Sequence, residues 1–176
     1  MSGQQSSDLS RNAIIVMGVC GCGKSKLATQ LSEELGFSMI EADDFHSDSN
    51  RAKMAKGIGL TDEDRKPWLQ TVSKAAEQKA ASDSGVIVAC SSLRRIYRDV
   101  FRSVLGDCKF IHLTGSKDLI ASRLTNRTGH FVDAGLLDSQ MATLEPLEGD
   151  ETGFTIDVAL PVSQVLEVAL QRLSKV

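Results

Sequence analysis

The chain contains 176 residues, of which 41% are hydrophobic and 24% are charged. A chain of this length is expected to form one domain, and its composition excludes the apolar-poor, highly charged class of disordered proteins. Its 20 Lys and Arg residues stand against 23 Asp and Glu residues, which gives a net charge of −3. This charge supplies no general positive field and argues against nucleic acid as a partner.

The cysteines and the N-terminal residues indicate the compartment. The four cysteines fit no C-x-x-C spacing and are too few for a disulfide scaffold, which predicts a reduced, cytoplasmic protein. Residues 1–12 are polar, and no stretch of the chain reaches the roughly 18 apolar residues that a membrane span needs. We therefore expect no membrane partner, a flexible tail over residues 1–12 and a single domain over residues 13–176.

Short apolar runs alternate with helical patterns along the chain. The runs predict five strands, at residues 13–17, 37–40, 86–90, 109–113 and 154–158. Apolar residues at 3.6-residue spacing predict helices at residues 24–35, 93–104 and 162–173. Strands that alternate with helices indicate an α/β fold, in which a parallel sheet is covered by helices on both faces.

A fourth helix ends near residue 81, and its start has two candidates. A capping box formed by Thr61 and Asp64 favours a start at residue 62, whereas Pro67 favours a start at its own position in the first turn. Two polar, glycine-containing stretches, 43–66 and 123–150, do not fit the alternation of strands and helices. We expect the residues that act on the substrate to lie in these two stretches.

The strongest motif follows the first predicted strand. Residues 18–25 match G-x-x-x-x-G-K-[ST] and lead into a predicted helix, which is the context that a phosphate-binding loop requires. Its backbone N–H groups would surround phosphate oxygens, Lys24 would reach the β- and γ-phosphates, and Ser25 would bind Mg²⁺. The expected nucleotide-binding residues of this segment are Gly18, Val19, Cys20, Gly21, Cys22, Gly23, Lys24, Ser25 and Lys26.

Two other interpretations of this segment remain. A glycine-rich turn can carry a Lys-Ser pair by chance, and Cys20 and Cys22 could indicate a metal or redox site. The two thiols have no further His or Cys nearby in the sequence, so we expect them to be small filling residues, although thiols at a helix N-terminus can be oxidisable.

Acidic residues follow the second predicted strand, at positions 41–44. In a parallel sheet they lie at the same edge as the phosphate loop, where a carboxylate can hold magnesium through water or accept the proton of an attacking hydroxyl. The alternative is a solvated or helix-capping turn. Since the chain also lacks an N-K-x-D segment for guanine, these features favour a kinase over a GTP switch.

Several segments together resemble gluconate kinase of the shikimate-kinase-like group. They are residues 18–25, E-A-D-D-F-H at 41–46, K-M-A-K-G at 53–57, L-T-D-E-D-R-K-P-W-L at 60–69, C-S-S-L at 90–93, Y-R-D at 97–99 and G-H-F at 129–131. The resemblance covers nearly the whole chain, and the D-x-D-R-x-P-W-L and G-H-F segments are the specific ones. Cys20 and Cys22 stand where the loop often has serines, and Glu41 stands where the family tends to have Asp.

This resemblance implies a P-loop NTPase-type three-layer sandwich with a five-stranded parallel sheet of order 2-3-1-4-5. It also implies a homodimer that uses ATP and Mg²⁺ to phosphorylate D-gluconate at its 6-hydroxyl. Asp43 would be the base or hydroxyl-orienting group, Glu41 would support magnesium through water, and Asp44 is a weaker alternative. Two rival functions stay open: a kinase for another small hydroxy acid or a nucleoside monophosphate, and a nucleotide-gated binding protein without transfer activity.

Gluconate has one carboxylate and five hydroxyls, so its site should contain an arginine and several polar groups. The candidates are His46, Arg51, Arg65, Arg98 and His130. Arg65 has the strongest claim, with a salt bridge to Asp62 or Asp64 as its alternative. His46 could equally cap the acidic turn, while Arg98 belongs to a row of arginines that is typical of a solvated helix face. We expect Trp68 in the core.

Arg123 and Arg127 precede a glycine, at the start of an expected lid over residues 123–138. The resemblance makes Arg127 a lid arginine that stabilises charge on the transferring phosphoryl group. Arg123 is expected to stack near adenine. The alternative is a pair of arginines on a helix surface.

Overall fold

The computed structural model describes residues 12–126 and 134–176. Its strands are β1 (Ala13–Met17), β2 (Ser38–Glu41), β3 (Val86–Ala89), β4 (Lys109–Thr114) and β5 (Gly153–Asp157). Its helices are α1 (Lys24–Leu35), α2 (Asp48–Ala55), α3 (Asp62–Ser82), α4 (Arg95–Leu105), α5 (Lys117–Thr125), α6 (Ala134–Thr143) and α7 (Val162–Leu173), and Ala42–Phe45 form the 3₁₀ turn η1. Within the described residues, no helix is long and apolar enough to cross a membrane.

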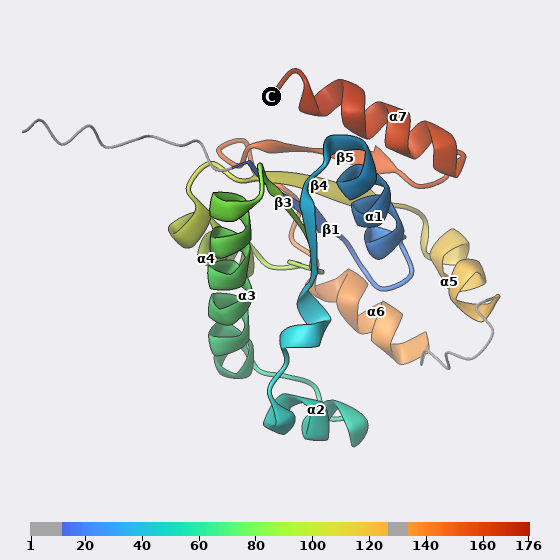
Figure 1. The fold of residues 1–176 in the computed structure, drawn as a ribbon. Helices are drawn as coiled ribbons and strands as arrows, with labels where there is room; N and C mark the ends of the chain where they lie inside the picture. The colour runs from blue at the N-terminus through green and yellow to red at the C-terminus, as the bar shows by residue number, and fades with distance from the viewer. Residues whose placement is uncertain (1–11, 127–133) are drawn as a thin grey trace, which may run out of the picture.

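The five strands form one parallel sheet in the order β2-β3-β1-β4-β5, which confirms the predicted topology. Helices α1 and α7 cover one face, and α3 and α4 cover the other (Figure 1). Each face therefore has its own apolar core. All five residues of β1 are buried, as expected for a central strand covered on both sides.

The predicted boundaries agree with the structure to within one residue for every strand. Helix α3 begins at Asp62, because Thr61 and Asp64 form a complete capping box, and Pro67 lies inside the helix. The stretch 43–66 contains most of η1, the short helix α2 and the first residues of α3. Helix α2 lies away from the sheet in Figure 1. Residues 1–11 of the expected tail lie outside the described residues, as do Arg127 and His130 of the expected lid.

The structure corrects the expectation for Arg98, which is fully buried. Its guanidinium donates to the Glu151 carboxylate from Nε (2.6 Å) and Nη2 (3.0 Å). The same group donates to four backbone carbonyls, those of Ser92, Leu93, Glu145 and Pro146. Because α4 turns this side chain into the core rather than to solvent, Arg98 fastens two loops to each other and does not face a substrate.

We expect Arg98→Met to destabilise the fold strongly. Removing one partner of a buried ion pair leaves the other charge uncompensated and typically costs about 3–5 kcal/mol. Urea denaturation would measure the loss. Arg102→Met is the matched control, because Arg102 is a partly exposed arginine on the same helix, whose ion pairs contribute about 0–1 kcal/mol. Equal losses for the two variants would contradict the assignment of Arg98.

Candidate active site

The phosphate loop connects β1 to α1, and at two of its glycines a positive φ and a close neighbour together leave no room for a side chain. Gly18 has φ +142°, and a Cβ there would lie 2.6 Å from the Leu113 carbonyl oxygen. Gly21 has φ +81°, and a Cβ there would lie 2.6 Å from Leu124 Cγ of α5. The Gly18 N–H donates to the Ser91 carbonyl (3.2 Å), which ties the loop to the end of β3. Strand ends and α5 thus fix the shape of the loop.

Helix α1 begins at Lys24 and directs two functional side chains to the loop. Lys24 Nζ donates to the carbonyl of Val19 (3.1 Å), so its charge lies over the loop. Ser25 Oγ donates to Glu41 Oε2 (2.6 Å), which joins α1 to the end of β2. Burial raises the pKa of Glu41 above its ordinary value, the Ser25 hydroxyl opposes the shift, and Asp43 adds to it.

These two oxygen donors fit magnesium. Mg²⁺ prefers oxygen ligands and is usually bound through one or two protein groups, water and substrate phosphates. A closed protein cage is not needed, and the described residues contain no group of three or more His, Cys, Asp or Glu suited to a metal. Ser25 and Glu41 would therefore hold the ion together with phosphate oxygens.

The acidic turn η1 presents Asp43 to solvent, with its side chain 80% exposed. Arg51 of α2 donates to the backbone carbonyls of this turn, from Nη2 to Asp44 (3.1 Å) and Asp43 (3.4 Å) and from Nε to His46 (3.3 Å). The Arg51 guanidinium thus holds the backbone of the turn and ties it to α2. Its predicted contact with substrate stays a prediction.

Arg65 lies at the start of α3 and donates from Nη1 to the Tyr97 hydroxyl (2.9 Å). Its guanidinium carbon lies 5.4 Å from the centre of the Tyr97 ring. In the described part of the chain, neither Asp62 nor Asp64 forms an ion pair with it: Asp62 pairs with Arg94, and Asp64 pairs with Lys53. The salt bridge to Asp62 or Asp64 that was the alternative for Arg65 is therefore absent among the described residues, and its substrate role stays a prediction.

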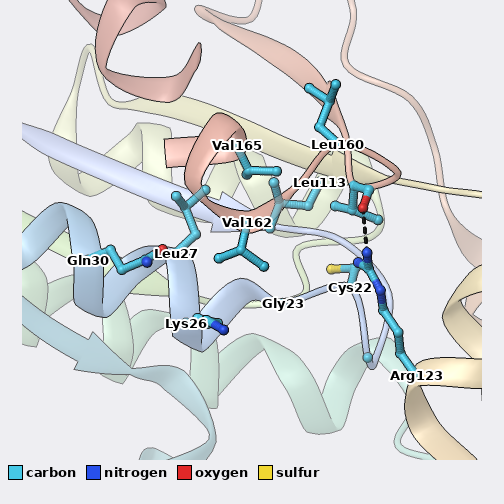
Figure 2. A pocket seen from close by; sticks show the side chains of 12 residues that line it. Cys22, Gly23, Lys26, Leu27, Gln30, Leu113, Arg123, Leu160, Val162 and Val165 are labelled. Atoms are coloured by element: carbon cyan, nitrogen blue, oxygen red, sulfur yellow. Dashed lines mark hydrogen bonds between the residues drawn. The ribbon is translucent and has the colours of Figure 1, made fainter. Parts of the chain in front are cut away.

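An apolar cavity of about 270 Å³ lies beside the phosphate loop. Figure 2 shows Leu27, Leu113, Leu160, Val162 and Val165 around it. A nucleotide whose phosphates occupy the loop can place its base there, since ligand pockets are largely apolar with a few polar groups.

Arg123 of α5 lines the same cavity, and its guanidinium has a defined partner. Nη2 donates to the backbone carbonyl of Val158 (2.6 Å), as the dashed line in Figure 2 marks. This bond joins α5 to the loop after β5. Arg123 is thereby held at the wall of the cavity, where its planar group can face a base.

Two residues that the sequence did not mark as part of the site support it. Trp68 Nε1 donates to the Ala42 carbonyl (2.8 Å), and its ring stacks on His46 at 4.0 Å. Gln140 Oε1 of α6 accepts the backbone N–H of Cys20 in the phosphate loop (2.7 Å). The P-W-L segment could have indicated Trp68, whereas no sequence signal marks Gln140, because its contact joins residues 120 positions apart.

Comparisons with known proteins agree with this geometry. The family described as AAA domain matches residues 14–147. A gluconokinase from Arabidopsis thaliana is 37% identical, with 94% of each chain covered, and the thermoresistant gluconokinase of Escherichia coli K12 is 36% identical, with 92% of this chain and 93% of that protein covered. The crystal structure of a gluconokinase from Sinorhizobium meliloti has a TM-score of 0.85 at 39% identity and covers 94% of this chain and 93% of that one.

We expect Val162→Trp to block the apolar cavity. Val162 is an exposed cavity residue of α7, so a larger side chain can fill the cavity without disturbing the core. The affinity for ATP should fall at least about tenfold, the equivalent of 1.4 kcal/mol, while that for tripolyphosphate stays within about twofold. Isothermal titration measures both.

Glu167→Trp is the control for that experiment, because Glu167 is exposed on the same helix and does not line the cavity. If the two variants lower ATP affinity equally, or if tripolyphosphate binding falls with that of ATP, the cavity does not hold the base.

Proposed function

The chain belongs to the gluconokinase family, and on that premise we propose that it transfers the γ-phosphoryl group of ATP to the 6-hydroxyl of D-gluconate. The observation that carries the proposal is the convergence of three features at one edge of the sheet. They are the phosphate loop, the Ser25–Glu41 pair and the exposed carboxylate of Asp43. A phosphate loop by itself would support nucleotide binding only, whereas an acid aimed beside it suits an attacking hydroxyl.

The reaction needs little covalent chemistry from the protein. The 6-hydroxyl oxygen forms a bond to the γ-phosphorus, the bond from that phosphorus to the β–γ bridging oxygen breaks, and ADP leaves with the electron pair. Asp43 accepts the hydroxyl proton and later releases it to solvent. Lys24 and the loop N–H groups oppose the charge on the phosphates, and Mg²⁺ bound near Ser25 and Glu41 would supply further neutralisation.

Arg65 is the proposed partner of the gluconate carboxylate. Its charge is permanent, its planar group can bind a carboxylate with two parallel hydrogen bonds, and the Tyr97 hydroxyl holds one of its nitrogens. Tyr97 in turn donates to Asp62 (2.5 Å), so a chain of hydrogen bonds orients the guanidinium. Asp43 and Arg65 would thus hold opposite ends of the acceptor.

The remaining assignments also belong to this proposal. Arg127 would stabilise the transferring phosphoryl group and His130 would contact gluconate, by resemblance, from residues that lie outside the described ones. ATP with Mg²⁺, a single kinase domain over residues 13–176, a cytoplasmic location and a homodimer complete it. They follow from the motifs and the family.

The direct test is a panel of acceptors with ATP and Mg²⁺, read by mass spectrometry. We expect gluconate to gain one phosphate, and Asp43→Asn to lower kcat by about 10²- to 10⁴-fold because the amide cannot accept the proton. ATP affinity should stay nearly unchanged. Phosphorylation of shikimate or a nucleoside monophosphate in place of gluconate would refute the acceptor, and full activity of Asp43→Asn would refute the role of that residue.

We expect Arg65→Met to raise KM for gluconate strongly, by about 10- to 150-fold, since a charge-assisted pair contributes roughly 1.5–3 kcal/mol. Tyr97→Phe should raise it less, because the arginine remains but loses its orienting hydroxyl. Steady-state kinetics at saturating ATP would measure both variants. The KM for ATP is the internal control: if it rises in step with that for gluconate, Arg65 does not select the acceptor.

A further inference from the structure

The His46 ring follows η1 and is held on three sides. Trp68 stacks on it with a centroid distance of 4.0 Å and an interplanar angle of 19°. On its edge, Nε2 lies 3.8 Å from Asp43 Oδ1, and Nδ1 lies 3.5 Å from Asn50 Nδ2. The His46 side chain is only 6% exposed, whereas that of Asp43 is 80% exposed. The buried His46 ring is thus held in place next to the exposed Asp43 carboxylate.

Asn50 determines which ring nitrogen carries the proton. This residue of α2 is 95% buried, since only 5% of its surface is exposed, and its Nδ2 also donates to the Asp64 carbonyl (3.2 Å). A carbonyl oxygen can only accept, so the amide nitrogen must face it, and the same nitrogen faces His46. A carboxamide nitrogen can only donate. Nδ1 of His46 is therefore the acceptor, and Nε2 bears the hydrogen.

We propose that His46 is a positioning residue whose Nε2–H orients the Asp43 carboxylate, and that Asn50 sets the tautomer this requires. The inference rests on the proposed function, in which Asp43 receives the proton of the acceptor hydroxyl. At 3.8 Å the Nε2–H would attract Oδ1 electrostatically, without a full hydrogen bond, and would leave Oδ2 for that hydroxyl. In this proposal His46 acts through Asp43 rather than by binding a hydroxyl itself.

The surroundings favour an uncharged ring. Burial lowers the pKa of His46, Asp43 opposes this shift, and the nearby Arg51 and Arg65 guanidinium groups add to it. A neutral imidazole has one donor nitrogen and one acceptor nitrogen. The tautomer therefore decides whether an N–H or a lone pair of His46 faces the Asp43 carboxylate. With the opposite tautomer, the lone pair of Nε2 would face the carboxylate and repel it.

The first experiment is a double-mutant cycle with His46→Phe and Asp43→Asn. Phenylalanine keeps a ring against Trp68 but removes the N–H. We expect His46→Phe to lower kcat by about 10- to 100-fold with KM for ATP unchanged, because a small misplacement of a reacting group has effects of this size. The double variant should be no slower than Asp43→Asn. If the two losses multiply, His46 acts independently of Asp43 and the inference is wrong.

His46→Gln is the matched variant that keeps a donor N–H but loses the stacked ring. We expect it to recover at least part of the kcat lost in His46→Phe. If it is as slow as His46→Phe while His46→Phe melts at the temperature of the unaltered protein, the N–H is not what matters, and the inference fails.

The second experiment reads the tautomer directly and needs no activity. The ¹⁵N shifts of His46, assigned with the His46→Gln variant, should report Nε2–H in the unaltered protein. In Asn50→Asp the new carboxylate accepts instead of donating, and the shifts should move to the Nδ1–H or doubly protonated form. A protonated Nδ1 in the unaltered protein would overturn the inference. Absence of gluconate phosphorylation by the unaltered protein would refute only the proposed function.

Discussion

The parallel pairing of β2, β3 and β1 is the constraint on which the site depends. Glu41, the last residue of β2, pairs with Ala89 of β3, which also pairs with Val16 of β1. Because all three strands run in the same direction, their carboxyl ends open at one edge of the sheet. The phosphate loop, the acidic turn and the β3–α4 loop therefore meet without a long connection. The bonds from Gly18 to Ser91 and from Ser25 to Glu41 fasten them to one another.

Two arginines near this edge of the sheet form hydrogen bonds mainly to backbone carbonyls. Arg98 binds four carbonyls and Glu151 inside the core, and Arg51 binds three carbonyls of the acidic turn. A guanidinium suits this work because it presents five donors in a rigid plane and stays charged when buried. The outcome is an exposed Asp43 on a backbone fixed by Arg51 and Trp68. Such preorganisation is what positioning-based phosphoryl transfer requires.

Two predicted substrate-binding arginines have different surroundings in the structure. Arg65 and Arg98 both lie in motifs that resemble gluconate kinase, and both were expected to bind substrate. Arg65 lies near the start of α3 and is hydrogen-bonded to a hydroxyl, whereas Arg98 is buried beneath α4 and forms an ion pair with a carboxylate. The helical period of the sequence shows which face of α4 is apolar. It does not show that Glu151, far away in the sequence, neutralises the charge of a buried arginine.

Local signals in the sequence were enough for the five strands, four of the helices and the phosphate loop, because strand alternation, capping residues and the G-x-x-x-x-G-K-S spacing involve neighbouring residues. The order of the strands came from the resemblance to a family, and helices α2, α5 and α6 had no periodic signal that predicted them. Tertiary structure alone decided which polar side chains support the site: Asn50 against His46, Trp68 against the acidic turn, and Arg98 against Glu151. These pairs join residues of different elements. Their hydrogen bonds depend on distance and direction in space, which spacing along the chain does not encode.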